Sequence, residues 1–211
     1  MATGRFITFE GGEGCGKSTQ IRFLAERLRA AGKEVLLTRE PGGTALAEKI
    51  RSLVREESDD PPNSRAETLL FIASRAQVVE SVIRPALASG TWVLCDRFAD
   101  STFAYQGYGR GLDLDELKRI NSFATGGLEP DRTILLNVSP EISAKRMRAR
   151  EAATNTDADR MEKAGDGFHA RLKQGFLELA AAEPKRFAVI QADGSVEEVA
   201  EAVWNSIQPM L

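Results

Sequence analysis

The stretch Gly11-Gly12-Glu13-Gly14-Cys15-Gly16-Lys17-Ser18 decides the fold of this 211-residue chain. It matches G-x-x-x-x-G-K-[ST], the pattern of a phosphate-binding loop (P-loop), whose backbone N–H groups surround phosphate oxygens. The segment Arg5–Glu10 before it predicts a short buried strand, and Thr19–Leu28 after it has apolar residues at helical spacing. A strand, a glycine-rich loop and a helix in this order are the context that the motif requires.

Phosphate binding at this loop follows from its residue types. Lys17 is expected to reach the β- and γ-phosphates of a nucleotide, and Ser18 to bind Mg²⁺ through its hydroxyl. The N-terminus of the following helix adds a partial positive charge. The sequence therefore predicts that nucleotide phosphates are bound by one run of residues: Gly11, Gly12, Glu13, Gly14, Cys15, Gly16, Lys17, Ser18 and Thr19.

The composition excludes some other classes of protein. The net charge of −3 argues against a general nucleic-acid binder, which would carry a basic face. No apolar run approaches the about 20 residues of a membrane-spanning helix. Cys15 and Cys95 are the only cysteines, both lie beside candidate phosphate-binding residues, and no signal peptide precedes the first strand. We therefore expect a reducing, cytoplasmic location.

Five short apolar runs predict the strands of the fold. Each is nearly continuous in apolar residues, which predicts burial on both faces, and helical patterns separate them, as in a parallel sheet covered by helices. The runs are Phe6–Phe9, Val35–Thr38, Trp92–Cys95, Thr133–Val138 and Ala188–Gln191. We predict a three-layer α/β P-loop NTPase fold with a five-stranded parallel sheet flanked by helices. No repeat or long linker divides residues 1–211, which predicts a single domain.

Local signals place several helix starts and one loop. Ser64-x-x-Glu67, Asp113-x-x-Glu116 and Ser195-x-x-Glu198 have the spacing of capping boxes, and Ser139-Pro140 puts proline at a first helical position. The run Glu151–Asp159 is polar with few apolar anchors, and we interpret it as a mobile loop.

A second candidate site lies at the end of the predicted strand Trp92–Cys95. Asp96 and Arg97 follow it directly, and ligands of open parallel sheets bind at the carboxyl ends of the strands. Both residues should therefore lie on the same rim as the phosphate loop. Asp96 is expected to hold Mg²⁺ together with Ser18, and Arg97 to clamp a second phosphate. The alternative is a surface ion pair with no ligand.

Further segments, added to the loop and the Asp96-Arg97 pair, give a resemblance to a known family. They are Thr38-Arg39-Glu40-Pro41-Gly42-Gly43-Thr44, Ser101-Thr102-x-x-Tyr105-Gln106 and Arg146-x-Arg148-x-Arg150. In this order, and over essentially the whole chain, they resemble thymidylate kinases. The resemblance implies transfer of the γ-phosphate of ATP to dTMP, giving dTDP and ADP, by a homodimer. We therefore predict a single nucleoside monophosphate kinase domain with ATP, dTMP and Mg²⁺ as its ligands.

The resemblance also implies roles for individual residues. Phe71 would stack on thymine, Arg75 would meet its O4, and Tyr105 would pack under the deoxyribose. Phe71 also fits an apolar core run, and Tyr105 also fits a partly buried core position, so both alternatives stay open. The substrate-binding set is Glu13, Arg39, Glu40, Pro41, Phe71, Arg75, Asp96, Arg97, Ser101, Thr102, Tyr105 and Gln106. The catalytic set is Lys17, Arg97, Arg150, Arg146 and Glu13.

The arginine run predicts a catalytic lid at about residues 146–160. Arg146 and Arg150 are one helical turn apart and share a face, whereas Arg148 points away. Some family members carry a catalytic arginine inside the phosphate loop, and others supply it from the lid. This loop holds no arginine, so the resemblance assigns the role to the lid, with Arg160 as a further candidate. A solvated basic face is the alternative.

Other functions remain open on the sequence alone. A deoxynucleoside kinase shares the loop and an Asp-Arg pair, and Glu40 would then act as a base toward a 5′-hydroxyl. Another nucleoside monophosphate kinase is also possible. A non-catalytic ATP-dependent switch is a third reading, although such a protein needs no second site of monophosphate size.

Overall fold

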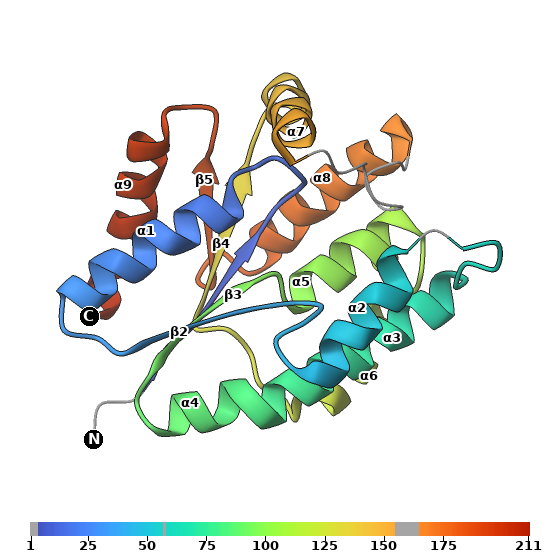
Figure 1. Cartoon of the computed structure of the whole chain (residues 1–211), viewed down its shortest axis with the longest axis horizontal. Coiled ribbons are helices and arrows are strands. Elements are labelled where there is room, and N and C mark those ends of the chain that lie inside the picture. The colour runs from blue at the N-terminus through green and yellow to red at the C-terminus, as the bar shows by residue number, and fades with distance from the viewer. Residues whose placement is uncertain (1–3, 57, 155–164) are drawn as a thin grey trace.

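A computed structural model describes residues 4–56, 58–154 and 165–211. Five parallel strands form one sheet in the order β2-β3-β1-β4-β5 (Figure 1). The strands are β1 (Phe6–Glu10), β2 (Val35–Arg39), β3 (Trp92–Asp96), β4 (Arg132–Asn137) and β5 (Phe187–Gln191). Each strand boundary lies within one residue of its predicted position, so the predicted five-stranded parallel sheet is confirmed.

The prediction that every strand is buried on both faces is wrong for the two edge strands. β1, β3 and β4 are buried over most of their length, whereas the residues of β2 and β5 are mostly half-buried or exposed. Leu37 and Val189 each expose 42% of their surface. An edge strand has a neighbour on one side only, so the helical layers cover it incompletely.

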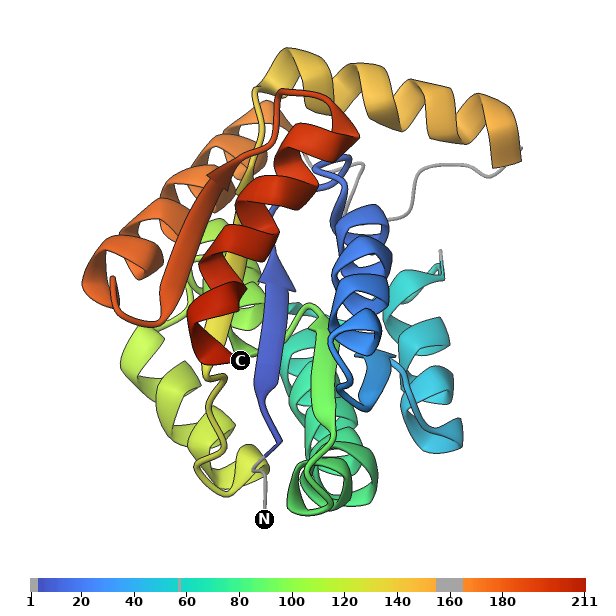
Figure 2. The same ribbon diagram turned by 90° about the vertical axis from the view of Figure 1, so that its left-hand side faces the viewer.

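Helices cover both faces of the sheet, which confirms the three-layer α/β architecture. On one face, α1 (Lys17–Ala30) and α9 (Val196–Ile207) pack together and share a buried apolar cluster with Ile7 and Phe9 of β1 (Figure 2). Phe6 lies in the cluster on the opposite face, with side chains of α3 (Ser64–Val78), α6 (Leu114–Thr125) and α8 (Asp166–Ala182). No helix within the described ranges is both long and apolar enough to span a membrane.

The other helical elements include the three that cover this second face. They are α2 (Ala45–Arg55), α3 (Ser64–Val78), the π-helix η1 (Val79–Ile83), α4 (Arg84–Ala88), α5 (Ala99–Thr102), the π-helix η2 (Phe103–Gly109), α6 (Leu114–Thr125), α7 (Pro140–Thr154), α8 (Asp166–Ala182) and the 3₁₀-helix η3 (Gln208–Met210). α5 and η2 are continuous, and π-helical turns often occur at functional sites.

Two of the three predicted helix caps are confirmed, and one is wrong. The side chain of Asp113 accepts from the N–H of Glu116, and Ser195 and Glu198 form a reciprocal capping box. At α3 the cap is Asn63 instead of the predicted Ser64: Asn63 Oδ1 accepts from the N–H groups of Arg65 and Ala66. Both residue types cap helices well, so the local sequence does not decide between neighbours.

The predicted loop Glu151–Asp159 is wrong in its first part. Residues Glu151–Thr154 continue α7, which starts at the predicted proline, Pro140. Alanine, arginine and glutamate dominate this end of α7, and all three favour helix, so the polarity of the run was a misleading signal. The rest of the predicted loop, and Arg160, lie outside the described residues.

Replacing Asn63 by alanine should destabilise the fold, because the first N–H groups of α3 would lose their acceptor. We expect the free energy of unfolding to fall by about 1 kcal/mol for Asn63→Ala and to stay within about 0.5 kcal/mol for Ser64→Ala. Urea denaturation of the two variants and the parent chain measures both values. A larger loss for Ser64→Ala than for Asn63→Ala would contradict the cap assignment.

Candidate active site

The phosphate loop connects β1 to α1 in a conformation that depends on glycine. Gly11 and Gly14 have φ angles of 134° and 67°, which other residues rarely adopt. A Cβ atom at Gly11 would also lie 2.6 Å from the carbonyl oxygen of Leu136. α1 begins directly after Gly16 without a side-chain cap. No side chain of the described residues caps this helix start, where the sequence predicts phosphate binding.

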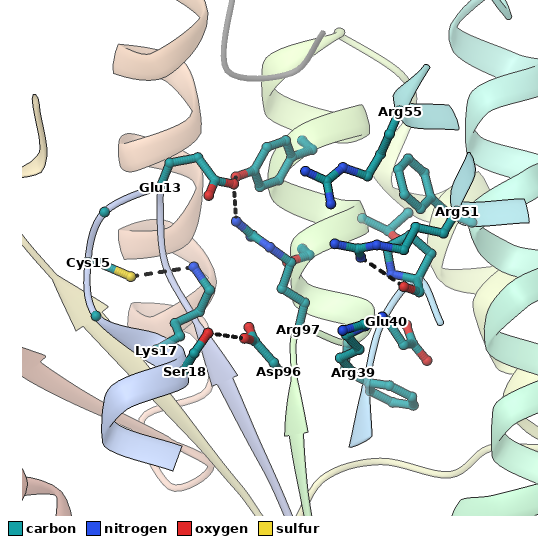
Figure 3. A pocket seen from close by; sticks show the side chains of 18 of the residues that line it. Glu13, Cys15, Lys17, Ser18, Arg39, Glu40, Arg51, Arg55, Asp96 and Arg97 are labelled. Carbon is teal, nitrogen blue, oxygen red and sulfur yellow. Dashed lines mark hydrogen bonds and ion pairs between the residues drawn. The ribbon is translucent and has the colours of Figure 1, made fainter. Parts of the chain in front are cut away.

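Lys17, Ser18 and Asp96 meet at the mouth of this loop (Figure 3). Lys17 Nζ donates to the carbonyl oxygens of Gly11 and Gly12 at 3.1 and 2.9 Å. Ser18 Oγ donates to Asp96 Oδ2 at 3.0 Å. The sheet brings Asp96 there because β3 is the neighbour of β1, with Phe9 opposite Asp96 in register. The predicted Ser18–Asp96 proximity is thus present.

The loop after β3 is held by a buried carboxylate that the sequence reasoning missed. Glu10, at the end of β1, accepts hydrogen bonds from the N–H groups of Phe98 and Ser101, at 2.8 and 3.2 Å, and from Ser101 Oγ at 2.6 Å. Burial, together with the charge of Asp100, raises the pKa of Glu10 to about 7. Arg97, inside this loop, has a φ of 69° and is the only non-glycine residue with positive φ among those described.

The side chain of Arg97 links the loop after β3 to the phosphate loop. Its guanidinium is ion-paired with Glu13, donates to the carbonyl of Gly11 at 3.2 Å, and lies 5.0 Å from the ring centre of Tyr105. Tyr105 Oη also donates to Glu13 Oε1, at 3.3 Å. Burial acts to raise the pKa of Glu13, but the nearby charges of Arg97, Lys17 and Arg150 hold it at about 2. Glu13 is therefore a carboxylate at neutral pH.

Arg75 also lines the cavity and is 2% exposed. Its Nε donates to Glu40 at 2.7 Å, and its Nη1 donates to Asn121 Oδ1 at 2.9 Å. Its Nη2 donates to the carbonyl of Phe98 and to Thr102 Oγ1, both at 3.0 Å. Burial raises the pKa of Glu40 to about 7, and the Arg75 guanidinium opposes this shift. These contacts fix the plane of the guanidinium.

Phe71 is one helical turn before Arg75 on α3. Its side chain is half-buried and lines the cavity, and Phe71 belongs to neither apolar core cluster. Its neighbour Ile72 is 7% exposed and Leu69 is 58% exposed, so the apolar run is divided between the core, the cavity and the surface. The core alternative for Phe71 is therefore not supported.

Three more arginines reach the cavity from β2 and α2. Arg39 is ion-paired with Glu48 at 3.1 Å, and Arg51 Nη1 donates to the carbonyl of Pro41 at 2.9 Å. Arg51 and Arg55 both line the cavity and were missed by the sequence reasoning (Figure 3). Their four-residue spacing after the Arg-Glu-Pro-Gly-Gly segment was the available signal.

Helix α7 packs on the phosphate loop. Ser143 Oγ donates to the carbonyl of Glu13 at 2.7 Å, and Arg146 Nη2 donates to the carbonyl of Gly194 at 3.4 Å. Arg146 and Arg150 line the cavity, and Arg148 does not, in agreement with the predicted helical face. Only the part of the predicted lid up to Thr154 lies within the described residues.

One cavity of about 560 Å³ joins these groups. Every predicted site residue lines it except Gly11 and Gly12, whose carbonyl oxygens hold Lys17. Its cations far outnumber its three carboxylates, Glu13, Glu40 and Asp96, which favours anionic ligands. The cations are Lys17, Arg39, Arg51, Arg55, Arg75, Arg97, Arg146 and Arg150. No group of three or more metal-binding side chains occurs in the described part of the chain.

The parallel sheet and the phosphate loop define a P-loop nucleotide-binding protein with a second, arginine-rich pocket. Comparison with known proteins points to one family. The family model "Thymidylate kinase" matches residues 9–203. Thymidylate kinases from Synechococcus sp. and Deinococcus radiodurans are 52% and 48% identical over 206 and 207 residues, covering 98% of this chain and 95% and 98% of theirs. The chain belongs to the thymidylate kinase family.

A solved structure agrees with this assignment. The thymidylate kinase from Ehrlichia chaffeensis superposes with a TM-score of 0.79 at 34% sequence identity, covering 98% of this chain and 100% of that one. Members of the family are phosphotransferases that use a nucleotide as phosphate donor.

The low pKa of Glu13 has a consequence for stability. A carboxyl whose pKa falls from 4.5 to about 2 on folding stabilises the native state above pH 4.5, and this contribution is lost as the pH falls toward 2. The stability difference between the parent chain and Glu13→Gln should therefore shrink by about 1 kcal/mol between about pH 7 and about pH 3.5. Urea denaturation at both pH values measures it. A difference independent of pH would show that Glu13 is not held ionised.

Proposed function

We propose that this protein transfers the γ-phosphoryl group of ATP to dTMP, giving dTDP and ADP. The observation that carries the proposal is the cavity that joins the phosphate loop to a pocket with Phe71, the buried Arg75 and the half-buried Arg97. A donor phosphate held at Lys17 and an acceptor phosphate held at Arg97 would face each other across it. In this proposal, residues 1–211 form one nucleoside monophosphate kinase domain.

On the donor side, the loop N–H groups and Lys17 hold the phosphates of ATP, with Thr19 in the first turn of α1. The residues present also suit Mg²⁺. Ser18 Oγ and Asp96 Oδ2 are oxygen ligands 3.0 Å apart, and Mg²⁺ needs few protein ligands because it keeps water and phosphate oxygens. Bound Mg²⁺ would neutralise part of the phosphate charge.

On the acceptor side, we assign each part of dTMP to residues that line the cavity. Arg97, with Arg39 and the additional Arg51, would hold the phosphate of dTMP. The half-buried ring of Phe71 offers a stacking surface for thymine. The remaining groups surround the base and the sugar: Glu13 for the 3′-hydroxyl, Tyr105 for the deoxyribose, Arg75 for O4, and Glu40, Pro41, Ser101, Thr102 and Gln106 around them.

Phosphoryl transfer then needs positioning and charge stabilisation more than covalent chemistry. The attacking group is an ionised phosphate oxygen, so no general base is required. Arg150 and Arg146 line the cavity from α7, and Arg150 is near enough to lower the pKa of Glu13. We propose that both stabilise the charge of the group in transfer.

The structure favours neither alternative function. In the deoxynucleoside kinase hypothesis Glu40 acts as the base, but Glu40 is 5% exposed and bonded to Arg75 at 2.7 Å. A non-catalytic ATP switch leaves the arginine-rich second pocket without a purpose.

We also propose a homodimer in the cytoplasm. α2, α3 and α6 pack side by side and carry exposed apolar side chains, namely Leu53 at 61%, Leu69 at 58% and Phe123 at 91% exposure. A second subunit would cover such side chains. Cys15 and Cys95 are free thiols, which suits a reducing compartment.

The proposal is tested by ADP formation from ATP and Mg²⁺ with single acceptors. We expect dTMP to be the preferred acceptor, and dCMP to be poorer by about 10⁴-fold in kcat/KM, because Arg75 has only donors to offer and the cytosine amino group is a donor. dUMP keeps O4 and should be poorer by about 10–200-fold. Lys17→Ala serves as the inactive control. Equal kcat/KM for dTMP and dCMP, or turnover of thymidine in place of dTMP, contradicts the proposal.

Removing Arg150 should lower kcat far more than it weakens dTMP binding, because its charge acts mainly on the transition state. We expect Arg150→Ala to lose about 10²-fold in kcat, less than an arginine finger usually contributes, because Arg146 shares its face. Arg148→Ala, one position off that face, is the matched control and should keep its kcat. A large effect of Arg148→Ala with none of Arg150→Ala would overturn the assignment.

A further inference from the structure

Gln106 has a second contact that the proposed dTMP site does not use. It lies in the π-helix η2, is 1% exposed and lines the cavity. Its Nε2 donates to Glu67 Oε1 at 2.9 Å. Glu67 is also 1% exposed, and its other oxygen, Oε2, is 3.5 Å from Arg110 Nη2. A buried carboxylate therefore lies between an arginine and the amide of a cavity residue.

The chemistry of this contact fixes which way the Gln106 amide points. A carboxylate can only accept hydrogen bonds, so the amide nitrogen has to face Glu67. The amide oxygen, Oε1, is then directed away from Glu67, and no N–H or O–H group of the described residues donates to it. Because Gln106 lines the cavity, the group that it can still offer to a ligand there is this oxygen, a hydrogen-bond acceptor.

Arg75 supplies the complementary donor, because its Nη1 keeps one N–H beyond the hydrogen bond to Asn121 Oδ1. Its Nη2 donates to Thr102 Oγ1 at 3.0 Å, and Thr102 precedes Gln106 by four residues on the continuous α5–η2 helix. Along α3, Glu67, Phe71 and Arg75 follow at four-residue spacing on neighbouring turns. A donor and an acceptor thus line the same cavity as the stacking ring.

This pair matches one pyrimidine edge and opposes the other. Thymine presents O4, an acceptor, next to N3–H, a donor. Cytosine presents an amino group, a donor, next to N3, an acceptor. We infer that Glu67 is a specificity-determining positioning residue, which holds the Gln106 amide so that its oxygen selects N3–H bases over cytosine. This inference rests on the proposed dTMP phosphorylation.

Glu67→Gln tests the inference directly. Arg110 can only donate, so it would bind the oxygen of the new amide at position 67 and turn the amino group of that amide toward Gln106. The Gln106 amide would then reverse and present N–H to the base. We expect the ratio of kcat/KM for dTMP to that for dCMP to fall about tenfold or more. Arg75 still opposes the cytosine amino group, so most of the change should be loss of dTMP activity.

The exchanged variant Glu67→Gln/Gln106→Glu provides a rescue. The new amide at position 67 would donate to the new carboxylate at position 106, whose other oxygen is an acceptor for N3–H. We expect this double variant to recover a ratio within about threefold of the parent chain. Glu201→Gln makes the same chemical change at an exposed carboxylate paired with Arg27 on the opposite face, and should leave the ratio unchanged.

Three results separate the possibilities. If Glu67→Gln only damages the structure in general, kcat/KM falls by a common factor for dTMP and dCMP, and their ratio stays the same. That result overturns the inference. If Glu67→Gln does not fold, the exchanged variant decides: a parent-like ratio supports the inference, and a collapsed ratio overturns it. If the parent chain itself does not phosphorylate dTMP, the proposed function fails first, so the two failures are distinguishable.

Discussion

The hydrogen bonds from Glu10 to the loop after β3 are the constraint on which the site depends. The carboxylate is fully buried at the end of β1 and binds the N–H groups of Phe98 and Ser101. These bonds hold Arg97 in a backbone conformation that is rare for a residue with a side chain. β1 and β3 are neighbours in the sheet, which brings Glu10 next to the loop after β3. The strand order therefore sets the geometry of this loop, and the loop sets the position of Arg97.

Two arginine–carboxylate ion pairs lie against the same loop. Arg97 pairs with Glu13 of the phosphate loop, and Arg75 pairs with Glu40 after β2. Each carboxylate fixes an arginine in place, and the cavity still has an excess of cationic side chains. Rigid arginines are what a phosphoryl-transfer site requires, because catalysis there rests on positioning and on charge stabilisation.

Features that short local motifs encode could be predicted from the sequence. Features that depend on how the elements pack could not. The strands, the phosphate loop and the position of Asp96 follow from short contiguous patterns. Arg51 was missed because its access to the cavity depends on how α2 packs against α3. The cap at Asn63 was missed because its neighbour is an equally good capping residue. Glu10 was missed because an acidic residue at the end of a strand gives no sign of what it will bind.

The central claim is that donor and acceptor phosphates meet in one cavity between Lys17 and Arg97. The most direct measurement is the affinity of a molecule in which adenosine and thymidine are joined through their 5′ positions by a polyphosphate chain. Such a molecule fills both sites at once, and calorimetry should show binding about 10²-fold or more tighter than either ATP or dTMP alone. Binding no tighter than the better single nucleotide, or binding that leaves the dTMP site open, would contradict the account.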